Sequence, residues 1–175
     1  MSAERILYSE SEISRRVAEI ARAIAGAPLR PEVATPILAG AFVFAADLMR
    51  ALAREGLDLA AEFLWLRSYG RGDRAGEVEV LKAPDATMIR GRIILLIDGV
   101  METGATLARA RDILIEAGAA RILSAVAVQK PCAAPAFTPD HVGFTAGAEF
   151  LYGYGMDRAG AGRGIPDIRI RKKNS

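Results

Sequence analysis

Apolar residues along the chain recur at two spacings, one typical of amphipathic helices and one typical of buried strands. Ser9-Glu10-Ser11-Glu12 has the pattern of a capping box, with Glu12 three residues after the cap. It predicts a helix that ends near Gly26 and Pro28. Two further helices are predicted, with inner faces formed by Phe42, Ala45, Leu48, Met49 and Leu52, and by Leu107, Ala110, Ile113, Leu114 and Ala117.

Short apolar runs between these helices predict strands. Residues 33–38, 62–66, 93–97 and 122–128 are such runs, and residues 77–81 alternate like a further strand. The run at 93–97 is continuously β-branched or leucine, as expected for a central strand buried on both faces. Shorter strand-like pieces lie around Phe144, Phe150 and Ile168. Strands that alternate with helices predict an α/β fold with a largely parallel central sheet flanked by helices.

Composition limits the classes of function. The length of 175 residues suits one domain, and 51% of residues are hydrophobic. A net charge of +2, from 23 basic and 21 acidic residues, is too even to favour nucleic acid as the partner. Cys132 is the only cysteine, no apolar run approaches the ~20 residues of a membrane helix, and the first residues lack the pattern of a signal peptide. We therefore expect a cytoplasmic protein with no membrane partner. His141, the single histidine, excludes a His-rich metal site.

The stretch from Ile97 to Thr106 carries the most chemical information. It joins a predicted buried strand to a predicted helix, and the free backbone amides of a helix N-terminus bind phosphate well. Thr103 and Thr106 add hydroxyl donors, and Asp98 and Glu102 are carboxylates that could hold Mg²⁺ or accept a proton. Thr-Gly-x-Thr alone also fits an ordinary threonine-capped helix. The acids, the strand and the helix together favour an anion site, and no Gly-Lys-Ser/Thr of a Walker A loop is present.

This stretch resembles the phosphoribosyl-pyrophosphate loop of the type I phosphoribosyltransferases. The resemblance covers most of the chain and is strongest toward hypoxanthine-guanine phosphoribosyltransferases. It extends to a flexible active-site loop at residues 67–70 and 76–78, to a base-recognition lysine in Gln129-Lys130-Pro131, and to Arg163. Residues 142–144 and 150–157 are similar to the hood of that family.

The resemblance implies a role for each matching residue. Glu102 would be the catalytic carboxylate near N7 of a purine, and Lys130 would donate to its 6-oxo group. The 5′-phosphate of the sugar donor would be bound by Asp98, Thr103, Gly104, Ala105 and Thr106, with Asp98 facing the ribose hydroxyls. Pyrophosphate would be bound by Ala39, Gly40 and Arg163. The base would stack on Phe150, bond to backbone groups of Leu151 and contact Asp157. Ser68 and Tyr69 would close over the site, and Mg²⁺ would be held by Asp157 and Asp98.

The chain departs from the family pattern at three positions around the expected site. Ala39 stands where the family has lysine, and Gly99 stands where it has a second acid beside Asp98. Glu102 replaces the family's usual aspartate and is longer by one methylene. A glycine at position 99 also raises the expectation of a positive φ, which other residues resist.

Three functions are compatible with this pattern. One is a purine salvage enzyme that transfers the phosphoribosyl group from phosphoribosyl pyrophosphate to hypoxanthine or guanine. Another is a purine- or nucleotide-binding regulator on the same fold with weak catalysis. The third is a phosphoribosyltransferase for another nucleobase. In each case we expect one domain over residues 1–175, whose hood combines the N-terminal segment with roughly residues 140–175. Apolar helix faces favour a homodimer or homotetramer.

Overall fold

A mostly parallel sheet forms the centre of the molecule. The computed structural model describes residues 4–68 and 78–171. The strand order is β5-β4-β2-β6-β7-β8, and a seventh strand, β3, pairs with β2. Only β5 is antiparallel to its neighbour. The bounds are β2 Val33–Leu38, β3 Ala60–Ala61, β4 Leu64–Ser68, β5 Val78–Lys82, β6 Ile93–Met101, β7 Arg121–Gln129 and β8 His141–Thr145.

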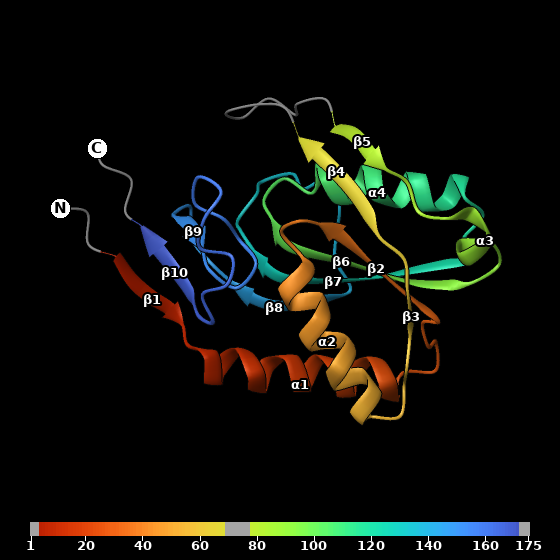
Figure 1. Ribbon diagram of the computed structural model, residues 1–175, viewed down its shortest axis with the longest axis horizontal. Coiled ribbons are helices and arrows are strands. Elements are labelled where there is room, and N and C mark those ends of the chain that lie inside the picture. Colours follow the sequence, from red (N-terminus) through yellow and green to blue (C-terminus); the bar gives the residue numbers. More distant parts are fainter. Residues whose placement is uncertain (1–3, 69–77, 172–175) are drawn as a thin grey trace.

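Helices cover both faces of this sheet (Figure 1). Helices α1 (Glu10–Gly26) and α2 (Phe42–Arg54) lie on one face, and α4 (Ala105–Glu116) and the short α3 (Ala86–Ile89) lie on the other. Side chains along β6 alternate between the two cores, as the pleat of a strand requires. Leu95 and Ile97 pack in the core that contains α1 and α2, whereas Ile94 and Leu96 pack in the core that contains α3 and α4.

A small antiparallel sheet joins the two ends of the described chain. Its strand order is β1-β10-β9, with bounds Glu4–Tyr8, Ile168–Arg171 and Phe150–Tyr152. It lies beside one end of the central sheet (Figure 1). The Tyr8 ring, which ends β1, stacks on Phe144 of β8 with ring centroids 4.0 Å apart, so the small sheet is packed directly against the large one.

The predicted fold class is confirmed, and so are the locations of the main helices and strands. The capping box is present, because the Ser9 backbone and Glu12 backbone each bond the other residue's side chain. Among the residues that the structure describes, no helix is long and apolar enough to cross a membrane.

Two details of the predicted elements are wrong. The central strand continues to Met101 instead of ending at Ile97, because Val100 and Met101 still pair with Val128 and Gln129 of β7. Phe42 is 44% exposed, and Phe44 is the buried aromatic residue of α2. Two residues correspond to about 200° around a helix, so these two side chains point in nearly opposite directions.

Candidate active site

A cavity of about 240 Å³ opens where the carboxyl ends of β6 and β7 meet the small sheet. Ligands bind at this edge in parallel sheets. The cavity is lined by Gly40, Asp98, Val100, Glu102, Lys130, Phe150, Leu151, Met156, Asp157 and Arg163. Most of the side chains that the sequence pattern singled out for the base, the metal and pyrophosphate are therefore brought together, although they come from five separate segments.

Three of the lining residues come from the end of β6 and the position after it. Asp98 and Val100 lie within β6, and Glu102 directly follows its last residue, Met101. Asp98 is half-buried, and its Oδ1 accepts a hydrogen bond of 2.7 Å from the backbone N–H of Gly99. Burial raises the pKa of Asp98 to about 7 against the opposing effect of that hydrogen bond. A proton or a cation is thus the natural counterpart for this carboxylate.

Glu102 and Lys130 form the shortest ion pair inside the cavity. Met101 and Gln129 are partners in the β6–β7 ladder, so the next residues, Glu102 and Lys130, leave the sheet side by side. Lys130 Nζ lies 2.5 Å from Glu102 Oε1. The lysine side chain is 12% exposed and the glutamate 63% exposed. A nearly buried cation therefore has one carboxylate partner, which solvent or a ligand can replace.

Another wall comes from β9 and the segment after it. Arg163 donates hydrogen bonds of 2.7 Å to Asp157 Oδ1 and to the Gly155 carbonyl. The backbone N–H of Gly160 donates to Asp157 Oδ2 at 2.9 Å. Phe150 is 42% exposed on this wall, so its ring is not a core side chain, whereas Leu151 is buried. The wall offers an aromatic face next to a paired acid and cation.

The loop between β2 and α2 approaches the site very closely. A Cβ at Gly99 would lie 2.6 Å from the Gly40 carbonyl oxygen, and a Cβ at Gly155 would lie 2.6 Å from the same oxygen. Gly99 does not have a positive φ, so that expectation is wrong. Glycine is needed at 99 because the Gly40 backbone occupies the space of a side chain. Ala39, joined to Leu38 by a cis peptide, is half-buried and does not line the cavity.

The predicted phosphate loop lies next to the cavity but outside its lining. Gly104 is the N-cap of α4 with φ 80°, and the Ala105 amide donates to Thr103 Oγ1 at 3.4 Å. The Thr106 amide has no acceptor within the helix, as for any residue of a first turn. A Cβ at Gly104 would lie 2.8 Å from the backbone nitrogen of Phe137, so the 131–140 segment supports this turn from behind.

Some described residues of the predicted site, such as Ala39 and Thr103, do not line the cavity, and some of its lining was not predicted. Ser68 ends β4, and Tyr69 lies outside the described residues. Val100 and Met156 were missed. Val100 lies in the part of β6 beyond Ile97 that the apolar run did not predict, and nothing in the sequence distinguishes Met156 from its neighbours.

The cavity has the composition of a site for a flat polar ring beside an anion. One acid–cation pair, an aromatic side chain and a second acid–cation pair all line it. Across the described ranges, no cluster of three or more histidine, cysteine, aspartate or glutamate side chains is placed to bind a metal. Asp98 and Asp157 nevertheless line one cavity, and one or two carboxylates together with substrate phosphates is how proteins usually bind Mg²⁺.

Comparison with known proteins agrees with this geometry. Residues 5–157 match the family model of the phosphoribosyl transferase domain. The chain is 34% identical to a hypoxanthine-guanine phosphoribosyltransferase of Aquifex aeolicus, over 94% of this chain and 92% of that protein. It is 33% identical to the Bacillus subtilis enzyme of the same name, over 97% and 93%. Among solved structures, it superposes on Trypanosoma cruzi hypoxanthine phosphoribosyltransferase in complex with the product IMP with a TM-score of 0.84 and 30% identity, covering 98% of this chain and 95% of that one.

Proposed function

The chain belongs to the phosphoribosyl transferase domain family, and from this premise we propose that it is a purine salvage enzyme. It transfers the phosphoribosyl group from phosphoribosyl pyrophosphate to hypoxanthine or guanine and releases pyrophosphate with IMP or GMP. The relatives named for this reaction match more than nine-tenths of the chain.

The position of Lys130 is the observation that carries the proposal. Its ammonium group is nearly buried at one wall of the cavity, and the Phe150 ring lies exposed at another. A purine stacked on Phe150 would present its 6-oxo acceptor to this cation. Adenine would present an amino group there, and a donor facing a donor is rejected strongly when the site is buried.

Glu102 would serve the transfer itself. The purine nitrogen forms a bond to C1 of the ribose while the bond from C1 to pyrophosphate breaks, and the purine loses a proton. Glu102 is the cavity carboxylate that pairs with Lys130. Once the base replaces Glu102 as the partner of the lysine, the Glu102 carboxylate is free to accept that proton near N7. The transition state is oxocarbenium-like, so positioning of the base and exclusion of water supply most of the catalysis.

The sugar donor would be bound on the other side of Glu102. The first-turn amides of α4 with Thr103 and Thr106 suit the 5′-phosphate, and Asp98 suits the ribose hydroxyls. Arg163 would turn from Asp157 to pyrophosphate, assisted by the backbone of Ala39 and Gly40. Asp98 and Asp157, which line one cavity, would hold Mg²⁺, and the ion would supply charge neutralisation of the leaving group. Ser68, the last residue of β4, and Tyr69 would close over the site.

A binding protein without efficient catalysis is the second candidate. It is favoured by the Gly40 carbonyl, which fills the space where the family's second acid would stand, and by Ala39, which removes a cation. A phosphoribosyltransferase for another nucleobase is favoured by the same departures.

Two further properties belong to the proposal. We expect a homodimer or homotetramer, and we expect the enzyme to act in the cytoplasm. The first expectation comes from apolar helix faces and the second from the single cysteine at position 132.

Turnover by the purified protein separates these functions. With phosphoribosyl pyrophosphate and Mg²⁺, the protein should convert hypoxanthine to IMP and release one pyrophosphate for each IMP. Binding of IMP without turnover of any purine would establish the regulator instead. Turnover of a different base, with hypoxanthine and guanine inert, would establish the third function.

A further inference from the structure

Directly after β9 the chain makes a tight turn with an unusual backbone conformation. Gly153, Tyr154 and Gly155 all have a positive φ, of 89°, 47° and 94°. A tyrosine adopts such a φ only where its surroundings hold it there. Here the backbone N–H of Tyr154 donates to the Ile165 carbonyl, and that of Gly155 donates to the Arg163 carbonyl, each at 2.8 Å. The turn is therefore fixed by the segment that follows it in the chain.

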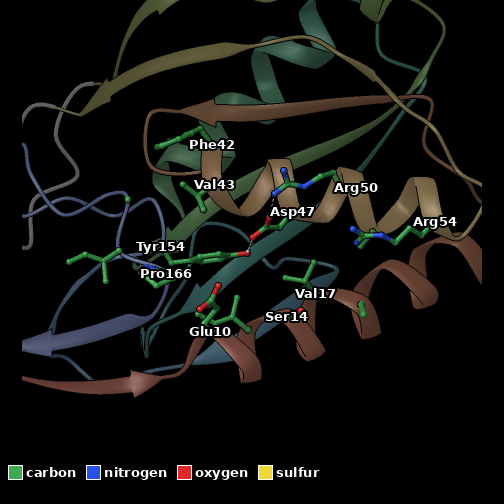
Figure 2. A pocket seen from close by; sticks show the side chains of 15 residues that line it. Glu10, Ser14, Val17, Phe42, Val43, Asp47, Arg50, Arg54, Tyr154 and Pro166 are labelled. Atoms are coloured by element: carbon green, nitrogen blue, oxygen red, sulfur yellow. Dashed lines mark hydrogen bonds and ion pairs between the residues drawn. The ribbon is translucent and has the colours of Figure 1, made fainter.

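The turn directs the Tyr154 side chain onto α2. Tyr154 is 4% exposed, and its Oη donates a hydrogen bond of 2.8 Å to Asp47 Oδ2 in the second turn of that helix (Figure 2). The Tyr154 and Phe44 rings lie with their centroids 6.4 Å apart. Burial and the neighbouring Asp47 carboxylate raise the pKa of the Tyr154 hydroxyl, so it remains a donor at physiological pH. Neither Tyr154 nor Asp47 lines the active-site cavity.

The backbone of the same turn meets the loop before α2. A Cβ at Gly155 would lie 2.6 Å from the Gly40 carbonyl oxygen and 3.5 Å from Val43 Cβ. Val43 and Asp47 are four residues apart in α2, so they lie on the same face of the helix. A backbone contact at Gly155 and a side-chain bond from Tyr154 therefore join the turn to α2 and to the loop that precedes it.

The other side of the turn holds a charged wall of the cavity. The Gly155 carbonyl accepts a hydrogen bond of 2.7 Å from Arg163, whose guanidinium also pairs with Asp157. The Gly155 backbone thus lies between Gly40 and Arg163, and both of these residues line the cavity. Ala39 supplies no cation to the loop. The binding of pyrophosphate would then depend strongly on where Arg163 stands relative to the Gly40 backbone.

We propose that Tyr154 is a positioning residue for the pyrophosphate part of the sugar donor and that it acts through its hydrogen bond to Asp47. The bond holds the turn against α2, and so holds Arg163 at a fixed distance from Gly40. The base is bound elsewhere in the cavity, at Lys130, and does not depend on this distance. The inference rests on the proposed function, which assigns pyrophosphate to Gly40 and Arg163.

Calorimetry with two ligands tests this role. Phosphoribosyl pyrophosphate with Mg²⁺ occupies the pyrophosphate subsite, whereas IMP carries no pyrophosphate and leaves that subsite empty. Tyr154→Phe removes only the hydroxyl group. It should raise the Kd of phosphoribosyl pyrophosphate about tenfold and change the Kd of IMP by less than about twofold. A general loosening of the fold would weaken both ligands alike, and melting temperatures verify that each variant is folded.

Variants of Asp47 test whether the hydrogen bond carries the effect. Asp47→Asn keeps an oxygen that can accept the bond and should bind the donor nearly as the wild type does. Asp47→Leu removes the acceptor and should behave like Tyr154→Phe. The double variant should be no weaker than either single variant, because both substitutions delete the same bond. Arg50→Ala removes the exposed ion pair of Asp47 but not the tyrosine bond, and serves as the matched control with unchanged donor binding.

Three results would overturn the inference. They are unchanged donor binding in Tyr154→Phe, equal weakening of the donor and IMP, and additive losses in the double variant. Turnover of hypoxanthine and donor binding by the wild type, measured on the same preparation, test the proposed function separately. A wild type that binds no phosphoribosyl pyrophosphate refutes the proposed function and the inference together. A wild type that turns over hypoxanthine, with donor binding that does not respond to Tyr154→Phe, refutes the inference alone.

Discussion

Shortening Glu102 should release the base-recognition lysine from its internal partner. In Glu102→Asp the carboxylate withdraws by one carbon–carbon bond, about 1.5 Å. The distance to Lys130 Nζ would grow from 2.5 Å to about 4 Å, the limit of an ion pair. Since the lysine is only 12% exposed, the freed cation is poorly solvated and gains more from a ligand acceptor than a surface lysine would.

The free energy that the ion pair contributes follows from the exposure of Glu102 and Lys130. Exposed pairs contribute about 0.2–1 kcal/mol, and hydrogen bonds to charged groups about 1.5–3 kcal/mol. With one partner largely exposed and the other largely buried, about 1 kcal/mol is a reasonable value for the pair. A ligand that no longer has to break it should bind about fivefold more tightly.

Calorimetry with IMP measures this effect directly, because IMP carries the 6-oxo group. IMP should bind Glu102→Asp about fivefold more tightly than it binds the wild type. Glu102→Gln, which keeps the length but removes the charge, should show a similar gain together with a large loss of turnover. AMP lacks the oxo acceptor and serves as the control ligand, with no gain expected in either variant. Unchanged or weaker IMP binding in both variants would refute the idea that Glu102 competes with the base.

Four other predictions concern the site and the fold. Glu102→Ala should reduce kcat by about two to four orders of magnitude while IMP binds at least as tightly as in the wild type, because Lys130 loses its internal partner. Near-normal steady-state turnover would remove Glu102 from the catalytic role. Ala39→Lys should lower the Michaelis constant for phosphoribosyl pyrophosphate by roughly tenfold. Gly99→Asp should lower the free energy of unfolding by about 1–3 kcal/mol, and with it the melting temperature, because its Cβ meets the Gly40 carbonyl; a Gly99→Asp protein that melts normally contradicts the close approach. Burial lowers the pKa of His141 below its ordinary 6.5, so the unfolded chain takes up a proton before the folded chain does. The free energy of unfolding should therefore fall as pH drops through 6.5 toward the folded-state pKa. Urea melts should show this loss in the wild type and not in His141→Asn.

Local patterns predicted the elements of the fold well. The capping box at Ser9 and the helical spacing behind it involve neighbours in the chain, so α1 could be placed from sequence. The end of β6 could not, because Val100 and Met101 stay in the strand only through their pairing with β7. Phe42 fits an apolar helix position, and only the packing of α2 on the sheet decides that Phe44 is buried in its place.

Sequence patterns singled out many of the residues that line the cavity, but not the partners of those residues. The ion pair between Glu102 and Lys130 joins residues 28 positions apart, and it depends on the register in which Met101 faces Gln129. The constraint on Gly99 comes from a loop near residue 40, which no pattern around position 99 reveals. The sequence therefore indicates which side chains can carry the chemistry, whereas their partners in the free protein require the fold.

The ratio of kcat/KM for hypoxanthine to that for adenine, measured in the wild type and in Lys130→Gln, tests the central claim most directly. The account predicts efficient turnover of hypoxanthine with Mg²⁺ and phosphoribosyl pyrophosphate, and little or none of adenine. A glutamine amide can face an oxo or an amino group, so the ratio should collapse in the variant, chiefly through the loss of hypoxanthine turnover. Efficient use of adenine with hypoxanthine inert, or an unchanged ratio in Lys130→Gln, would contradict the account.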